Sequence, residues 1–233
     1  PGIYEIESTK IIAAKVTSVN NSWKSINYPE SYNTTPVVFA QQVSSNESSA
    51  TVLRMKNISN NKFDIMVQEE ENSNGTHSNE DVCYLAISKG NVTIGDYNIL
   101  VNATSNSVTD SWYTINFDAT IDNPSFFANM QTCDGGDPAG LRYNSLTSNN
   151  VKVMCEEEQS KDEEIGHTTE VVGWMAVNDL MNPSFNPSIE LPGDEVVSNK
   201  LSLLQNDPNP FNPSTSIKFI LPAKEKVKLE VFN

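Results

Sequence analysis

Apolar and polar residues alternate in short runs along most of the first 178 residues of the chain. Residues 37–40, 50–55 and 63–67 combine β-branched side chains with a period of two, which is typical of half-buried strands. Turn-forming residues separate these runs, as at Asn74-Gly75 and in the glycine-rich stretch 134–138. No run shows the sustained period of an amphipathic helix flanked by capping residues. The pattern therefore predicts an all-β protein.

The same series of strands occurs twice. The segment 22–28 (SWKSINY) recurs as 111–117 (SWYTINF), 89 residues later. Residues 63–70 match 151–158 at an offset of 88, and residues 77–86 match 167–176 at an offset of 90. With about six short strands per copy and no helices, we expect two tandem antiparallel β-sandwich domains, residues 1–92 and 93–178. We call them copy one and copy two.

Both copies contain one recurring set of polar residues followed by an aromatic residue. In copy one the set is Arg54, Glu69, Glu70, His77 and Glu80, followed by Tyr84. In copy two it is Arg142, Glu157, Glu158, His167 and Glu170, followed by Trp174. Because the set is duplicated, whatever role it has is expected in both copies.

Four interpretations of this set stay open. Carboxylates with a histidine suit a metal ion; neither copy has the spaced Asp and Asn of a calcium loop, so we expect no cofactor and keep calcium as the alternative. Paired carboxylates also suit glycoside hydrolysis. A cross-strand Arg–Glu–His network would fix strand register. A shallow glycan or partner site would add stacking on Tyr84 or Trp174, although their parity with Val82 and Val172 suits the core equally.

Three cysteines and three tryptophans add little to these interpretations. Cys83, Cys133 and Cys155 have no CxxC spacing, which argues against a zinc site. One bridge, Cys133–Cys155, is a candidate disulfide, and free buried thiols are the alternative. Trp23 and Trp112 each open a strand pattern, so we expect them to anchor the two cores.

The order of strand motifs in each copy resembles the H-type lectin domain and its bacterial relatives. A Trp-x-x-Ile-x-aromatic strand is followed by a Pro-Val strand, an Arg-containing strand and a closing strand with an aromatic residue and Ala, over residues ~18–90 and ~107–178. The resemblance implies a six-stranded antiparallel sandwich, often oligomeric, and N-acetylgalactosamine-type ligands. The sugar-contacting residues of those lectins have no one-for-one match in this sequence.

The last quarter of the chain changes character. Residues 179–200 are rich in Pro and Asn and are expected to form a linker. Residues 206–215 (NDPNPFNPST) closely resemble the opening of the C-terminal sorting domain of the type IX secretion system of Bacteroidota. The residues that carry this resemblance are Asn206, Pro208, Asn209, Pro210, Phe211, Asn212 and Pro213. It implies that residues 201–233 form the N-terminal part of an Ig-like β domain, that the secretion machinery is a partner, and that the protein is extracellular or on the outer surface of a Bacteroidota-type cell.

Charge and composition exclude several classes of partner. With 15 Lys and Arg against 30 Asp and Glu, the net charge of −15 disfavours nucleic acid and anionic lipid. No apolar run approaches the roughly 20 residues that span a bilayer. The chain opens Pro1-Gly2-Ile3-Tyr4 without a basic and then apolar run, as expected for a mature exported chain.

These observations favour a secreted, non-catalytic binding protein. The sequence has no nucleophile–base arrangement, phosphate-binding glycine loop or HExxH motif, so an enzyme is the weakest hypothesis. We expect an adhesive module whose partners are glycans or other surface proteins. The alternative is a structural subunit that forms a homo-oligomer or polymer in an extracellular fibre, sheath or layer, because duplication suits assembly as well as avidity.

Overall fold

The computed structural model describes residues 1–73, 75–178, 202–203 and 219–220, in two compact units, Pro1–Phe185 and Asn186–Asn233. All regular elements of these residues are β-strands, which confirms the all-β prediction. Copy one contains β1 (Gly2–Ile6), β2 (Thr9–Val19), β3 (Lys24–Asn27), β4 (Val37–Gln42), β5 (Thr51–Lys56), β6 (Lys62–Glu69) and β7 (Glu80–Ile87). Copy two begins with β8 (Gly90–Ile94), slightly before the predicted start at residue 93, and continues with β9 (Tyr97–Ala103), β10 (Tyr113–Asn116), β11 (Pro124–Met130), β12 (Ala139–Asn144), β13 (Asn150–Glu157) and β14 (Val172–Asn178). In the second unit, β15 (Ser202–Leu203) pairs antiparallel with β16 (Phe219–Ile220).

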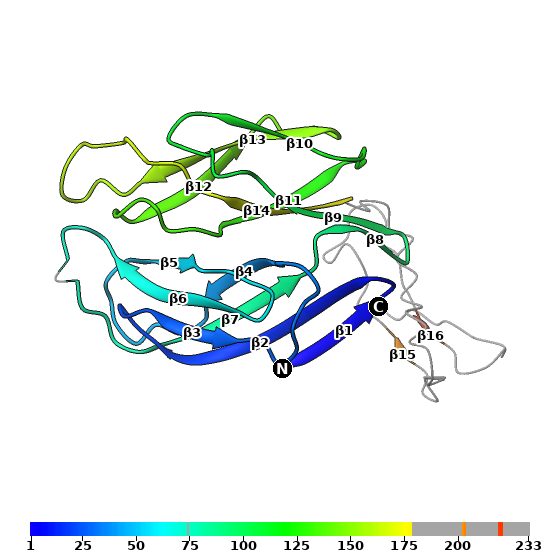
Figure 1. Cartoon of the computed structure of the whole chain (residues 1–233), viewed down its shortest axis with the longest axis horizontal. Coiled ribbons are helices and arrows are strands. Elements are labelled where there is room, and N and C mark those ends of the chain that lie inside the picture. Colours follow the sequence, from blue (N-terminus) through cyan, green and yellow to red (C-terminus); the bar gives the residue numbers. More distant parts are fainter. Residues whose placement is uncertain (74, 179–201, 204–218, 221–233) are drawn as a thin grey trace, which may run out of the picture. The chain divides into compact units, whose positions relative to one another are not determined.

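Each copy consists of a four-stranded and a three-stranded antiparallel sheet (Figure 1). The sheets of copy one have the orders β1-β2-β7-β4 and β3-β6-β5. Copy two repeats both orders as β8-β9-β14-β11 and β10-β13-β12, so each copy has one strand more than the sequence predicted. The equivalent turn residues Asn57 and Ser145 both have positive φ, 53° and 52°, so the duplication extends to an unusual backbone conformation.

Strict alternation of buried residues builds each core. In β6 the side chains of Phe63, Ile65 and Val67 are buried against the opposite sheet, while the residues between them are only partly covered. Tyr84 stacks edge-on to Phe63 at 5.1 Å between ring centroids, and Trp174 occupies the equivalent place in copy two. Both aromatic residues are therefore core residues, as their strand parity allowed.

Trp23 and Trp112 are not the core anchors that the sequence suggested. Trp112 is 46% exposed, and Trp23 is half-buried with the ammonium group of Lys56 4.0 Å from its ring centroid. Each precedes the short strand β3 or β10 rather than lying within it, so strand alternation does not turn it inward. Tyr28 and Tyr32 take part in the core of copy one instead.

A third apolar cluster joins the two copies. It brings Val37 and Ile87 of copy one together with Val101 of copy two, and partly buried side chains surround them. These side chains come from the outward faces of the two four-stranded sheets, which in a lone sandwich would face water. Apolar burial therefore holds both copies in one compact unit.

The free edge of β4 is covered by a side chain of copy two. The Gln131 side chain accepts a hydrogen bond from the Val38 amide at 2.8 Å and donates one to the Val38 carbonyl at 2.9 Å. Its amide thus replaces a neighbouring strand at this position and satisfies backbone groups that the cluster removes from water. Close approach of the copies at this point also requires Gly173, because a Cβ there would lie 2.6 Å from both Val37 Cγ1 and Gln131 Cδ.

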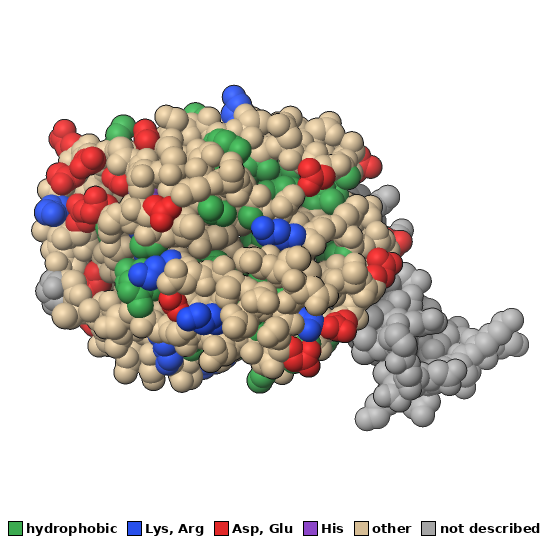
Figure 2. Space-filling view, in the orientation of Figure 1, with side chains coloured by type: hydrophobic (Ala, Val, Ile, Leu, Met, Phe, Trp, Pro, Cys, Tyr) green, Lys and Arg blue, Asp and Glu red, His purple; other side chains and the backbone are tan. Residues whose placement is uncertain are grey.

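Acidic side chains gather at one end of the surface. Figure 2 shows them clustered where the loop between β13 and β14 lies, whereas Lys and Arg are dispersed. That loop contains Glu158, Asp162, Glu163 and Glu164, with Lys161 among them. No helix among the described residues is long and apolar enough to cross a membrane.

The linker 179–200 and the sorting residues Asn206 to Pro213 lie outside the described residues, as does most of the expected Ig-like segment.

We predict that Gly173→Ala lowers the free energy of unfolding by about 1–3 kcal/mol, the usual cost of overpacking a well-filled contact. The new methyl group must displace Val37 or Gln131 from the joint. Gly140→Ala is the matched control, because nothing lies within 4 Å of a Cβ at that position. Urea denaturation measures both, and equal stability of the two variants would contradict a tight joint at Gly173.

Candidate functional site

A buried Glu–His–Glu cluster closes one end of the copy-one core. Glu69 ends β6 in the row of Phe63, Ile65 and Val67, and Glu80 begins β7, so strand alternation turns both carboxylates inward. His77, from the loop between them, places Nδ1 3.2 Å from Glu69 and Nε2 3.2 Å from Glu80. The three side chains are almost completely buried.

Copy two contains the same cluster. His167 lies with Nδ1 2.7 Å from Glu157 and Nε2 3.2 Å from Glu170. Its three side chains are also almost completely buried. A cross-strand Arg–Glu–His network was one interpretation of the sequence, and the structure shows that its glutamate and histidine members meet in both copies.

In each cluster the second carboxylate accepts hydrogen bonds from a loop, the one between β4 and β5 in copy one and the one between β11 and β12 in copy two. Glu80 accepts hydrogen bonds from the Ser44 hydroxyl and from the Asn46 amide at 2.7 Å. Burial raises the pKa of Glu80, but the hydrogen bonds from Ser44, Asn46 and His77 outweigh it and leave the pKa below its ordinary value. Glu80 is therefore held as a carboxylate.

Glu170 is anchored in the same way, by the Thr132 hydroxyl and by the amides of Asp134 and Gly135 at 3.0 and 3.1 Å. Burial raises its pKa, whereas hydrogen bonds from His167 and these donors lower it, and the net direction is downward. The hydrogen bond to Glu170 raises the pKa of His167 above its ordinary 6.5, against the effect of burial. The pair is thus stabilised in its charged form.

One cluster receives an arginine from the other copy. Arg54, on β5 of copy one, places Nη2 3.3 Å from Glu170 and donates a 2.9 Å hydrogen bond to the Gly135 carbonyl. It also bonds the Asp137 carbonyl and Gln68, and its side chain is completely buried. Arg54 therefore connects the two copies through buried polar contacts and cannot reach a ligand at the surface.

Its equivalent in copy two has a different environment. The Arg142 side chain is 64% exposed and pairs with Glu156 on the neighbouring strand. The difference follows from the arrangement, since only copy one has another sandwich placed against this position.

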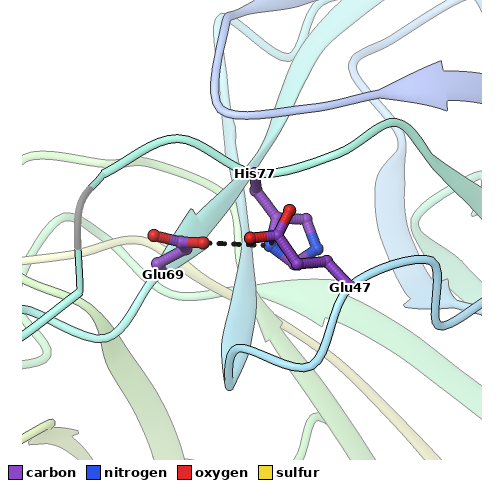
Figure 3. Close-up of side chains that lie close together, drawn as sticks. All are labelled: Glu47, Glu69 and His77. Carbon is purple, nitrogen blue, oxygen red and sulfur yellow. Dashed lines mark hydrogen bonds and ion pairs between the residues drawn. The ribbon is translucent and has the colours of Figure 1, made fainter.

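The clusters also differ at the residue that follows the anchoring amide. Copy one has Glu47, whose carboxylate lies 3.8 Å from His77 Nδ1, on the same side of the ring as Glu69 (Figure 3). Copy two has Gly135, where a Cβ would lie only 2.4 Å from the His167 ring. Glu47 is 29% exposed, so the copy-one cluster opens to solvent beside it.

The remaining residues of the recurring set lie outside the clusters. The Glu70 side chain is half-buried and touches Ser73, and Glu158 accepts a hydrogen bond from the Glu71 amide at 2.9 Å across the joint. Cys83, Cys133 and Cys155 are free thiols, so the Cys133–Cys155 bridge considered from the sequence does not form. Cys155 is instead buried in the core of copy two.

A groove runs beside the copy-one cluster, where copy one meets the loop 134–138. Glu69, Glu70, Glu71 and Asp137 are among its lining residues. The hydrogen bond with Asp137 raises the pKa of Glu71 to about 7. With Glu69, Glu70 and Asp137 against the single cation Lys161 among its lining residues, the groove remains predominantly acidic near neutral pH.

Sequence reasoning missed the residues that hold the clusters in place. Ser44 and Thr132, and likewise Asn46 and Asp134, are equivalent at an offset of 88, so extending the repeat alignment through the loops would have found them. Glu47 and Gln131 had no such signal, because each occurs in one copy only.

We predict that Arg54→Met lowers the free energy of unfolding by about 3 kcal/mol, because it leaves the Glu170 carboxylate with one buried positive partner fewer. Arg142→Met is the matched control; it removes an exposed ion pair of the type usually worth under about 1 kcal/mol. Urea denaturation of both variants measures the difference. A loss of the same size in both would mean that Arg54 contributes no more than a surface residue.

The His167–Glu170 pair predicts a dependence of stability on pH. The raised pKa of His167 gives stability that is full below pH 6.5 and is lost as pH rises through the higher folded value. The lowered pKa of Glu170 gives stability that is full above 4.5 and is lost as pH falls through the lower folded value. The difference in unfolding free energy between wild type and His167→Gln should therefore be largest between pH 4.5 and pH 6.5, and it should shrink as the pH rises above 6.5. A difference that stays constant up to pH 9 would contradict this assignment.

Comparison with known proteins gives one similarity. No family model matches the chain, and no solved structure matches it. The chain is similar to Halomucin of Haloquadratum walsbyi (strain DSM 16790 / HBSQ001), with 31% identity over 176 residues. The match covers 74% of this chain and 2% of Halomucin, so the chain spans only a small part of that relative's length.

Proposed function

We propose that this chain is a non-catalytic module of a secreted or cell-surface protein, in which the two sandwiches act as one rigid structural and adhesive unit. The joint between the copies is the observation that carries this proposal. Arg54, Gln131 and the cluster around Val37 combine buried polar contacts of fixed direction with apolar burial. A joint of this kind holds two sandwiches in one orientation, which suits a mechanical or display role better than two independently moving domains would.

The buried clusters argue against catalysis as their purpose. A general acid or base must reach the substrate atom that it protonates or deprotonates. Glu69, His77 and Glu80 lie at the end of a filled core, and their counterparts in copy two are as deeply buried. We therefore assign the clusters to structure and not to turnover.

Three observations support a location outside the cell. The similarity to Halomucin is a similarity to a protein named as a mucin. The net charge of −15 suits a solvated surface protein that does not bind nucleic acid. The resemblance of residues 206–215 to a type IX sorting domain supports export and would make that secretion machinery a partner.

Glycan binding is the second candidate function, and one position favours it. Arg142 is the member of the recurring set that stays largely exposed, and the neighbouring Tyr143 is 55% exposed. An exposed guanidinium offers hydrogen bonds that sugars use, while Tyr143, which points to the other face of β12 and packs against Phe126, presents its exposed ring edge separately. The other members are buried or half-buried, so an H-type-lectin-like site would have to lie on this edge of copy two.

Antibody labelling of intact cells that produce the protein tests the proposed location. We expect labelling, and loss of the signal on brief protease treatment, before any lysis. Signal that emerges only after lysis would overturn the surface assignment. A glycan array with wild type and Arg142→Ala separates the two functions: binding that is lost in the variant favours the glycan site, and no binding by the wild type leaves the structural role as the proposal.

A further inference from the structure

We propose that Glu47, Glu69 and His77 form a binding site for a divalent cation of the zinc class, in copy one only. The site lies in the copy-one cluster at the end of the core, where Glu47 opens it to solvent. The inference is independent of where the protein resides and of what else it binds.

The geometry of the three side chains suits such an ion. One atom from each, Nδ1 of His77 and a carboxylate oxygen of Glu47 and Glu69, lie within 4.8 Å of one another. The Nδ1 atom lies 3.2 Å from Glu69 and 3.8 Å from Glu47 (Figure 3). Ligands of a tetrahedral zinc ion, each bound at about 2.0–2.2 Å, are roughly 3.3 Å apart, so small movements would complete the set and leave a position for water.

The second nitrogen of His77 is held as the outer shell of a metal site requires. Nε2 lies 3.2 Å from Glu80, which is in turn fixed by Ser44 and the Asn46 amide. A carboxylate behind a histidine fixes the ring orientation and directs the other nitrogen toward the metal. Glu80 is here a positioning residue, whereas Glu47 and Glu69 are the ligands.

Copy two shows that the equivalent cluster takes a second positive charge, there on the Nε2 side of its histidine. There Arg54 enters from the other copy, bonds Glu170 and the Gly135 carbonyl, and thereby supplies the cation. With His167 protonated, the two positive groups balance the two carboxylates of that cluster.

Copy one has the opposite balance. The ion pairs of Glu47, Glu69 and Glu80 within residues 1–73 and 75–178 are all with His77. Glu47, where copy two has Gly135, brings the number of carboxylates to three, and even a protonated His77 would cancel only one of their three negative charges. Buried or half-buried negative charges are costly without a counterion, and a divalent cation bound to the neutral imidazole through Nδ1 cancels two of the three.

The ligand types favour zinc over calcium. Calcium prefers six to eight oxygen ligands from a flexible loop, whereas an imidazole nitrogen with two carboxylates is a typical set for zinc and its neighbours in the transition series. The proposed site therefore differs in two ways from the calcium alternative considered from the sequence. The ion is of the zinc class, and one ligand is Glu47, which is not part of the recurring set.

Competition titration of the whole chain tests the proposal. The protein is first dialysed against EDTA and then titrated with Zn²⁺ in a nitrilotriacetate buffer, which masks weak binding to the many surface carboxylates. We expect one equivalent to bind to the wild type and at least about 10-fold weaker binding to Glu47→Gly, which reproduces the residue of copy two. Glu157→Gln, in the copy-two cluster, is the matched control and should bind like the wild type.

Two further readings keep the result unambiguous. Near-ultraviolet circular dichroism in EDTA should be the same for Glu47→Gly and wild type, so that lost binding is not lost folding. Co²⁺ should give visible absorption bands of a nitrogen- and oxygen-ligated ion with the wild type only. Absence of a stoichiometric Zn²⁺ site in the wild type, unchanged affinity in Glu47→Gly, or an equal loss in Glu157→Gln would each overturn the proposal.

Discussion

The structure depends on neutralising two inward-facing carboxylates at the end of each sandwich core. Glu69 and Glu80 stand in the same alternating rows as core residues, so they cannot turn to solvent without shifting the register of β6 or β7. A histidine placed between them satisfies both through its two ring nitrogens. The network thereby ties the ends of two strands, one from each sheet, to the loop that follows β4.

The same constraint accounts for how the copies diverged. One imidazolium cannot balance the charge of two carboxylates, and the two copies differ in what surrounds the remaining negative charge. Copy two takes Arg54 from its neighbour and has Gly135, which leaves room against the His167 ring. Among the described residues the copy-one cluster receives no such arginine, and it presents Glu47 instead. A charge imbalance inside one sandwich has thus become part of the contact between two.

Much of the fold follows from local patterns in the sequence. The alternation in β4, β5 and β6 is strong enough to locate these strands, and the internal repeat extends the assignment to copy two. The short strands at the start of each copy were harder, because β1 and β8 are edge strands of mixed polarity whose pairing partner follows a tight turn. Trp23 was misplaced for a related reason, since a bulky residue just before a strand is not bound by its alternation.

The candidate site could be predicted in composition but not in arrangement. The spacing of Glu69, His77 and Glu80 recurs in copy two with a two-residue insertion, so their association was visible in the sequence. The burial of Arg54 was not, because it results from the placement of one sandwich against the other over more than 80 residues of chain. Gln131 and Gly173 escaped notice for the same reason, since their roles exist only at the joint.

The joint also limits how such units can be combined. Copy one has Val43 and Cys83 at the positions where copy two has Gln131 and Gly173. A side chain equivalent to Val37 cannot approach Cys83 as Val37 approaches Gly173, because the Cβ of Cys83 occupies that space. Val43 also lacks the amide that satisfies the edge of β4. A further sandwich therefore cannot dock on copy one through the contact that joins the two copies, because that contact needs both the glycine and the glutamine.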